Sequence, residues 1–253
     1  MGITVVEEKR SRIIVHPPTH PLLSIIYTLG GVIIASLLSY LVATSGLFLA
    51  PRYRDEVYLA SFLLALSPAS SYVNIILKEI DTGVSEQVLT FEYISIYGIP
   101  IPIPRVALVR RKVILAVNVG GAVIPIIVSL LFINVSLRAA PQKPVAMAFI
   151  LSYIVVTIAT FLTSRVIPGA GIAVPALVPP LSSALVVSLI LGAGIIPGLV
   201  AYSAAALGSL TGADILRLFK EIDKLPPGLV SIGGVGVFDG IFLSGALALV
   251  FTI

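Results

Sequence analysis

Charged residues are scarce in this chain, and cysteine and tryptophan are absent from it. Only 11% of its 253 residues are charged, whereas soluble domains have about 25%. The lack of cysteine excludes a disulfide framework and thiol chemistry. Because 58% of the residues are hydrophobic and the mean hydropathy is +1.11, the composition indicates a polytopic membrane protein whose main partner is the lipid bilayer.

Histidine and basic residues are too few or too scattered to indicate a metal or nucleic-acid site. The spacing of His16 and His20 suits a metal on a helix, but Pro17 and Pro18 between them exclude that helix. Lys and Arg lie in loops between apolar runs, so the net charge of +4 does not indicate binding to nucleic acid. No glycine-rich phosphate loop, zinc motif or Ser/His triad occurs. We expect no metal and no cofactor, and the oligomeric state stays open.

Seven apolar segments are long enough to be membrane spans. The first follows about 20 mostly polar residues and is too long for a signal-peptide core, so we expect it to be a span. Prolines interrupt the fifth, which predicts a broken or re-entrant helix. The sequence predicts one all-α membrane domain over residues 1–253, with spans at 22–50, 57–77, 113–137, 145–164, 172–191, 195–214 and 231–253.

Two segments between the apolar runs are rich in β-branched residues. Residues 1–20 hold two short runs around a charged turn and predict a small hairpin. Residues 78–112 predict a second hairpin at the membrane surface, with its turn at Tyr97-Gly98. Pro100, Pro102 and Pro104 lack the amide hydrogen that a central strand needs, so we expect their arm at an edge.

The distribution of basic residues predicts how the chain sits in the membrane. With seven spans, 12 Lys and Arg lie on the side of the N-terminus and 4 on the other side. The positive-inside rule therefore predicts a cytoplasmic N-terminus and an extracytoplasmic C-terminus, in a multi-pass protein of the plasma membrane. Both β segments, 1–20 and 78–112, are then cytoplasmic.

Small residues recur every fourth position on the last two spans. They are Ala204, Gly208 and Gly212, followed by Gly236, Gly240, Ser244 and Ala248. This spacing places small residues on one helical face, where backbones can approach closely. We therefore expect the last two spans to pack against each other.

Two acids on these same spans are the main functional signal. A carboxylate inside the bilayer costs roughly 2.5–3.5 kcal/mol on insertion scales, so Asp239 and Asp214 are candidate functional residues. Two neighbouring carboxylates cannot both ionise cheaply, so one can activate water while the other donates a proton. The same residues can instead bind or relay a cation or a proton.

Each acid also has a structural interpretation. Asp214 can be the N-cap of an amphipathic interfacial helix over residues 215–225, whose apolar positions have helical spacing. Asp239 can be satisfied by backbone groups freed at Gly233–Gly236. If the last span is helical from Ile232, Asp239 lies roughly 10 Å deep at 1.5 Å per residue. The two acids then meet only where the glycine-rich stretch is unwound or Asp214 lies deeper.

Glycines and prolines that interrupt spans mark the alternative, transporter-like site. Polar groups at broken helices near mid-membrane are typical of ion or substrate sites in transporters. The candidates are Asn118 with Gly120 and Gly121, the segment 169–180, and Asp239. A small ion is the corresponding partner. A third possibility is a non-enzymatic scaffold whose cytoplasmic hairpins bind other proteins.

Two resemblances add to this interpretation. The segments NVGGAVIP, GIAVPALVPPL, LTGADIL and GVGVFDGIFLSG resemble an uncharacterised archaeal and bacterial family of integral-membrane proteins. The pair of acids on consecutive spans is similar to that of presenilin-like and prepilin-peptidase-like intramembrane aspartyl proteases. Their Gly-x-Gly-Asp signature compares with Gly234, Gly236 and Asp239, with two extra residues before the acid in this chain, and their Pro-Ala-Leu triplet with Pro175 to Leu177. This second resemblance implies a di-aspartyl hydrolase with a membrane-peptide substrate.

Overall fold

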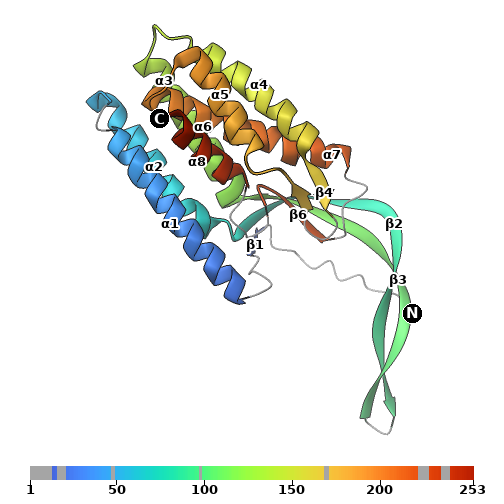
Figure 1. The fold of residues 1–253 in the computed structure, drawn as a ribbon. Helices are drawn as coiled ribbons and strands as arrows, with labels where there is room; N and C mark the ends of the chain where they lie inside the picture. Colours follow the sequence, from blue (N-terminus) through green and yellow to red (C-terminus); the bar gives the residue numbers. More distant parts are fainter. Residues whose placement is uncertain are drawn as a thin grey trace.

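The protein is a bundle of apolar helices with a β-sheet at one end (Figure 1). The computed structural model describes residues 13–15, 21–46, 49–96, 99–167, 171–221, 228–234 and 240–253. The main helices in this part of the chain are α1 (Pro21–Gly46), α2 (Arg54–Ser70), α3 (Ile124–Ala139), α4 (Val145–Thr163), α5 (Val178–Leu191), α6 (Ile195–Ser209) and α8 (Gly240–Thr252). They run alternately toward and away from the sheet.

Two π-helical segments lengthen this bundle. The segment η2 (Val119–Val123) leads directly into α3, and η3 (Leu210–Arg217) continues α6 into α7 (Leu218–Lys220). A short 3-10 turn, η1 (Pro51–Tyr53), precedes α2. π-Helical turns in long helices frequently occur at functional sites. Both predicted groups of site residues, around Asn118 and Asp214, fall on or beside these segments.

Three helical stretches are long and apolar enough to cross a membrane. They are Val119–Ala139, Val145–Thr163 and Ile195–Lys220. In contrast, α5 and α8 have 14 and 13 residues, so they span roughly 20 Å at 1.5 Å per residue against a hydrocarbon core of about 30 Å. The structure thus supports a membrane protein, and the number of complete crossings stays a prediction.

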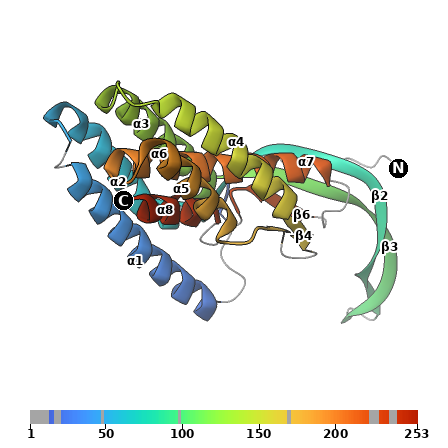
Figure 2. The same cartoon turned by 45° about the horizontal axis from the view of Figure 1, so that its top comes forward.

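A four-stranded sheet gathers segments that are distant in the sequence. Its strands β1 (Ile13–Val15), β2 (Val73–Ile96), β3 (Ile99–Asn118) and β6 (Gly228–Ile232) lie in the order β1-β2-β3-β6. The predicted hairpin over 78–112 is confirmed as β2 and β3, which pair antiparallel from Ile96↔Ile99. This hairpin extends beyond the helices (Figure 1, Figure 2).

The hairpin is longer than predicted, and two predicted span boundaries are therefore wrong. Residues 73–77 and 113–118, placed in helical spans from the sequence, are strand residues of β2 and β3. Val113, Leu115 and Ala116 are buried, and a short buried apolar run cannot be assigned to helix or strand by hydropathy alone. The predicted N-terminal hairpin has one described arm, β1, which pairs with β2. The other arm of that N-terminal hairpin lies outside the described residues. The turn of the second hairpin, at 97–98, lies outside them as well.

The proline-rich arm lies at an edge, as predicted. Pro100, Pro102 and Pro104 pair with β2 on one side, whereas β6 covers only residues 113–117 of β3. Since alternate residues of an antiparallel strand direct their amides away from the partner, prolines two apart fit that outer side.

The predicted break in the fifth span is also present. Before α5, the chain forms a two-stranded sheet of β4 (Arg165–Ile167) and β5 (Gly171–Ala173).

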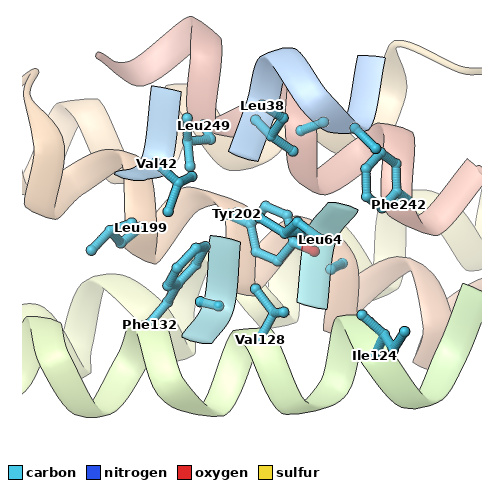
Figure 3. Close-up of a cluster of buried hydrophobic side chains, with 14 of the residues drawn as sticks. Leu38, Val42, Leu64, Ile124, Val128, Phe132, Leu199, Tyr202, Phe242 and Leu249 are labelled. Atoms are coloured by element: carbon cyan, nitrogen blue, oxygen red, sulfur yellow. The ribbon is translucent and has the colours of Figure 1, made fainter. Parts of the chain in front are cut away.

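The main core lies where α1, α2, α3, α6 and α8 meet (Figure 3). Tyr202 of α6 is fully buried at its centre and packs edge-to-face on Phe132 at 5.1 Å between ring centroids. Leu64 of α2 and Phe242 of α8 close the same cluster. A second cluster joins α4 and α5 to α6 and α8. Helix α6 therefore contacts neighbours on several sides, and it is the central helix of the bundle.

The predicted packing of the last two spans against each other is confirmed, although other glycines make the contact. The two helices pack together, but Gly198 and Gly245 make that contact, against Ile253 and the Tyr202 ring. Gly208 instead faces α4, where an added Cβ would lie 2.7 Å from Val156 Cβ. The small residues Gly208 and Gly212 therefore let α4, and not α8, approach α6 and η3 closely. The predicted helix contact at Gly240 is wrong, since a Cβ there would meet nothing within 4 Å, and Gly236 lies outside the described residues.

Candidate functional site

Asp214 lies inside a helix and not at its first residue. The helical chain runs without a break from Ile195 to Lys220, with Asp214 in the π-helical segment η3. The N-cap interpretation of Asp214 is therefore wrong. The sequence suggested a new helix because an amphipathic pattern begins at residue 215, but such a pattern does not show that the preceding helix has ended. Its carboxylate instead accepts a hydrogen bond from the Gly233 amide, with Oδ2 2.6 Å from the nitrogen.

This hydrogen bond fixes the turn between β6 and α8 beside η3. Gly233 and Gly234 have φ angles of +87° and +84°, a region that glycine occupies at little cost. An added Cβ at Gly233 would lie 2.7 Å from the Ala122 nitrogen and Cβ. The close approach to η2 and the positive φ both require glycine. The Asp214 carboxylate is thus held against a backbone turn that is itself packed on the start of α3.

A cavity of about 210 Å³ opens beside Asp214. The unwound segment before α5, the η3 end of α6 and the start of α8 form its walls. The lining residues are Ile172, Ala173, Val174, Pro175, Ala176, Pro179, Ser209, Ala213, Asp214, Gly240, Ile241, Leu243 and Ser244.

The short length of α5 and α8 explains where this cavity lies. Pro179 in the first turn of α5 and Gly240, the first residue of α8, both line it. Helix α5 begins at the cavity, the described part of α8 starts at its wall, and α6 with η3 continues past it. The N-terminal ends of helices carry partial positive charge, worth typically 0.3–1 kcal/mol to a nearby anion. The N-terminal end of α5 therefore places partial positive charge beside the cavity.

Two serines add polar groups to the cavity. The Ser209 hydroxyl is buried and has no hydrogen-bond partner among the described residues. Ser244 donates to the Gly240 carbonyl, 2.5 Å away. A buried hydroxyl without a hydrogen-bond partner costs about 1–3 kcal/mol. The Asp214 carboxylate is therefore the main polar group of the cavity, because the Ser209 hydroxyl has almost no accessible surface.

The structure brings some predicted site residues together and leaves others apart. Pro175 and Asp214 share the cavity. Asp239 and Gly236 lie outside the described residues, and Gly240, which follows Asp239 in the chain, is on the cavity wall. Gly234 lies in the turn after β6, where its amide donates to the Ser231 carbonyl at 3.2 Å.

Asn118 belongs to a different polar cluster, at the junction of the sheet and the helices. Its Oδ1 accepts from the Gly121 amide at 2.7 Å and so caps η2. Its Nδ2 donates to the Ser71 carbonyl at 2.5 Å and to Asn74 Oδ1 at 3.1 Å. Ser231 of β6 donates to the same Asn74 Oδ1 at 2.7 Å. This cluster ties the end of α2, both long strands and β6 to the start of α3.

Gly120 permits the close contact at that junction. An added Cβ would overlap the Ser67 carbonyl and lie 2.5 Å from the Ser71 amide nitrogen. Ser67 also donates to the Gly120 carbonyl at 2.7 Å. The described contacts of Asn118, Gly120 and Gly121 are therefore structural. The ion site predicted at these residues stays a prediction.

Sequence reasoning missed Ser209, Ser244 and Asn74. Ser209 and Asp214 are five positions apart, which in an α-helix places them about 140° apart around the axis. The π-helical turn, with its i→i+5 bonding, moves such positions toward one face. No pattern in the sequence indicates that turn. For Asn74, burial inside a predicted span was a usable signal, because polar residues there require partners.

Comparison with known proteins identifies the family. Searches of curated proteins and of solved structures found no match. A family described as "Protein of unknown function (DUF1614)" matches residues 69–251. That range includes the hairpin, the Asn118 cluster, the unwound segment before α5 and Asp214. The match covers most of the chain, and the protein belongs to the DUF1614 family.

Proposed function

We propose that this protein is a membrane-embedded hydrolase that uses Asp214 and Asp239 as its acid–base pair. One observation carries the proposal. The Asp214 carboxylate lines a cavity together with Pro175 and with Gly240, the residue after Asp239 in the chain. Asp214 and Pro175 are far apart in the sequence, and their order along the chain does not predict that they lie at one cavity.

In this proposal Asp214 is the base. The Gly233 amide donates to its carboxylate and holds it in place beside the cavity. In the proposed reaction, Asp214 takes a proton from water while the hydroxide adds to an amide carbonyl carbon. Asp239 donates a proton to the departing amine as the carbon–nitrogen bond breaks. Water is consumed, and no other reactant is needed.

Hydrolysis of a membrane peptide is the direct test. Purified protein in liposomes is incubated with single-span peptides in H₂¹⁸O, and the products are analysed by mass spectrometry. We expect one ¹⁸O atom in each new carboxyl group. Asp214→Asn and Asp239→Asn should each slow cleavage by about 10²-fold or more. Asp55→Asn is the matched control, since Asp55 is an exposed acid at the start of α2.

The outcomes of this experiment are distinct. Cleavage by Asp214→Asn at the wild-type rate would remove that residue from the mechanism. A folded wild-type protein that cleaves no peptide in the set would reject peptide hydrolysis. Circular dichroism of each variant shows whether a loss of activity reflects a loss of fold.

A proton- or cation-conducting protein is the second candidate, and one observation favours it. The hydroxyls of Tyr202 and Ser129 are buried in the bundle without hydrogen-bond partners among the described residues. Tyr202 projects between Leu64 and Val128 (Figure 3). Such groups, with Ser209 further along α6, could hold internal waters that carry protons. Proton flux into liposomes that Tyr202→Phe abolishes would support conduction, and flux that this substitution leaves unchanged would contradict it.

A further inference from the structure

Three basic side chains are grouped at the end of α4 nearest the sheet. Lys220 of α7 and Arg217 of η3 lie over the Phe161 ring of α4, with Nζ 5.2 Å and Cζ 5.9 Å from its centroid. Cations within about 6 Å of an aromatic centroid are attracted to the face of the ring. Arg165 begins β4, two residues after α4 ends at Thr163. In both views α7 lies beside this end of α4 (Figure 1, Figure 2).

One of these three cations is neutralised by a described carboxylate, and two are not. Arg217 pairs with Glu221 at 2.9 Å, and their side chains are only 19% and 12% exposed. Lys220 and Arg165 are exposed, and neither forms an ion pair with a described residue. This surface therefore has two uncompensated positive charges among its described residues, and they favour a ligand that carries negative charge.

The length of α4 places these charges at the level of the lipid headgroups. Helix α4 has 19 residues, so it is roughly 28 Å long at 1.5 Å per residue, close to a hydrocarbon core of about 30 Å. A helix of this length that crosses the bilayer ends at headgroup level on both sides. The apolar side chains of Leu162, Leu216 and Phe219 are exposed beside the cations. Exposed apolar and basic residues side by side are typical of a membrane interface.

We propose that Arg165 and Lys220 bind the phosphodiester headgroup of an anionic bilayer lipid in the leaflet next to the sheet. The three exposed apolar side chains then contact the acyl chains of the same lipid. A soluble acidic ligand would neutralise the cations but leave these apolar side chains in water, and the lipid covers both. None of the five residues lines the Asp214 cavity, so this site is separate from that of the proposed hydrolysis.

The absence of tryptophan provides the test. Phe219→Trp places a single fluorophore on α7 beside Lys220, and Leu185→Trp places one on α5 at a side chain that is 64% exposed. Each reporter is reconstituted in mixtures that contain phosphatidylglycerol or phosphatidylcholine with acyl chains brominated near the headgroup, which quench tryptophan on contact. Phosphatidylglycerol is anionic and phosphatidylcholine is zwitterionic, so the ratio of their binding constants measures the preference for negative charge.

We expect the α7 reporter to prefer phosphatidylglycerol by about fivefold for each uncompensated cation. In that reporter, Arg165→Gln or Lys220→Gln should lower the preference by this factor, and the two together should bring the ratio close to one. Glu221→Gln should raise the preference by a similar factor, because it leaves Arg217 without its partner. The α5 reporter should show a ratio near one throughout.

Lys78→Gln is the matched control, since Lys78 is another exposed cation, on β2. It should leave the preference of the α7 reporter unchanged. Leu216→Trp is a second reporter, and native mass spectrometry of the wild-type protein and of the Arg165→Gln, Lys220→Gln double variant counts retained phosphatidylglycerol without any reporter. Circular dichroism of each variant shows whether a lost preference reflects a lost fold.

Four results would overturn the proposal. The first is an equal lipid preference at the α7 and α5 reporters. The second is a preference that survives loss of both Arg165 and Lys220. The third is an equal loss from Lys78→Gln, which would show attraction by the surface as a whole. The fourth is a soluble acidic peptide that removes quenching at the α7 reporter alone, which would assign the cations to a protein partner. None of these measurements depends on peptide cleavage, so this proposal and the proposed hydrolysis can fail separately.

Discussion

Three glycine-to-alanine substitutions test whether α6 is the tightly packed centre of the bundle. At Gly30 of α1, an added Cβ meets nothing within 4 Å. At Gly208 it would lie 2.7 Å from Val156 Cβ and Cγ1, which are side-chain atoms. At Gly212 it would overlap the Thr157 carbonyl as well as Thr160 Oγ1, so backbone must move. The series therefore runs from free space, through a side-chain contact, to a backbone contact.

The expected free energies follow from two opposing terms. Alanine gains about 1 kcal/mol over glycine in a helix interior, and overpacking costs typically 1–3 kcal/mol. Gly30→Ala should therefore stabilise the fold by about 0.5–1 kcal/mol, the gain of alanine alone. Gly208→Ala should be destabilising by about 1 kcal/mol or less, and Gly212→Ala by about 2 kcal/mol, near the upper end of the overpacking cost.

Unfolding in mixed micelles of increasing SDS content, followed by far-ultraviolet circular dichroism, measures this order. The midpoints should fall in the sequence Gly30→Ala, wild type, Gly208→Ala, Gly212→Ala. A Gly212→Ala protein as stable as Gly30→Ala would refute the contact between η3 and α4. It would also show that close packing does not require glycine at position 212.

Two further predictions concern the junction and the orientation. Asn118→Ala should destabilise the fold by about 2–4 kcal/mol, since it leaves the Ser71 carbonyl and the Gly121 amide without this partner; an unchanged SDS midpoint would contradict that role. Lys78→Cys in β2 and Gln142→Cys between α3 and α4 are both at exposed positions, and they should react with impermeant thiol reagents from opposite sides of the membrane, with Lys78→Cys cytoplasmic. Labelling of both from one side would contradict the predicted topology.

The sequence predicts the larger elements well because hydropathy acts over many residues. A run of about 20 apolar residues has few stable alternatives to a helix in a membrane, and the bounds of α4 were predicted to within one residue. The hairpin around Tyr97-Gly98 was also predictable, because β-branched residues, prolines and a glycine turn all indicate the same structure. Where local signals conflicted, the first residues of β2 (73–77) and the last residues of β3 (113–118) were missed.

The sequence alone determined that this is a membrane protein, that it contains a β-hairpin, and that Asp214 is costly to bury and so needs an explanation. Only the tertiary structure decided what Asp214 contacts. Its bond to Gly233 and the cavity that it shares with Pro175 and Gly240 join residues from three separate segments. The π-helical segment η3 sets the direction of the Asp214 side chain. The same segment packs against α4 at Gly212. Such contacts depend on the shapes of distant segments, which the pattern of hydrophobic and polar residues does not encode locally.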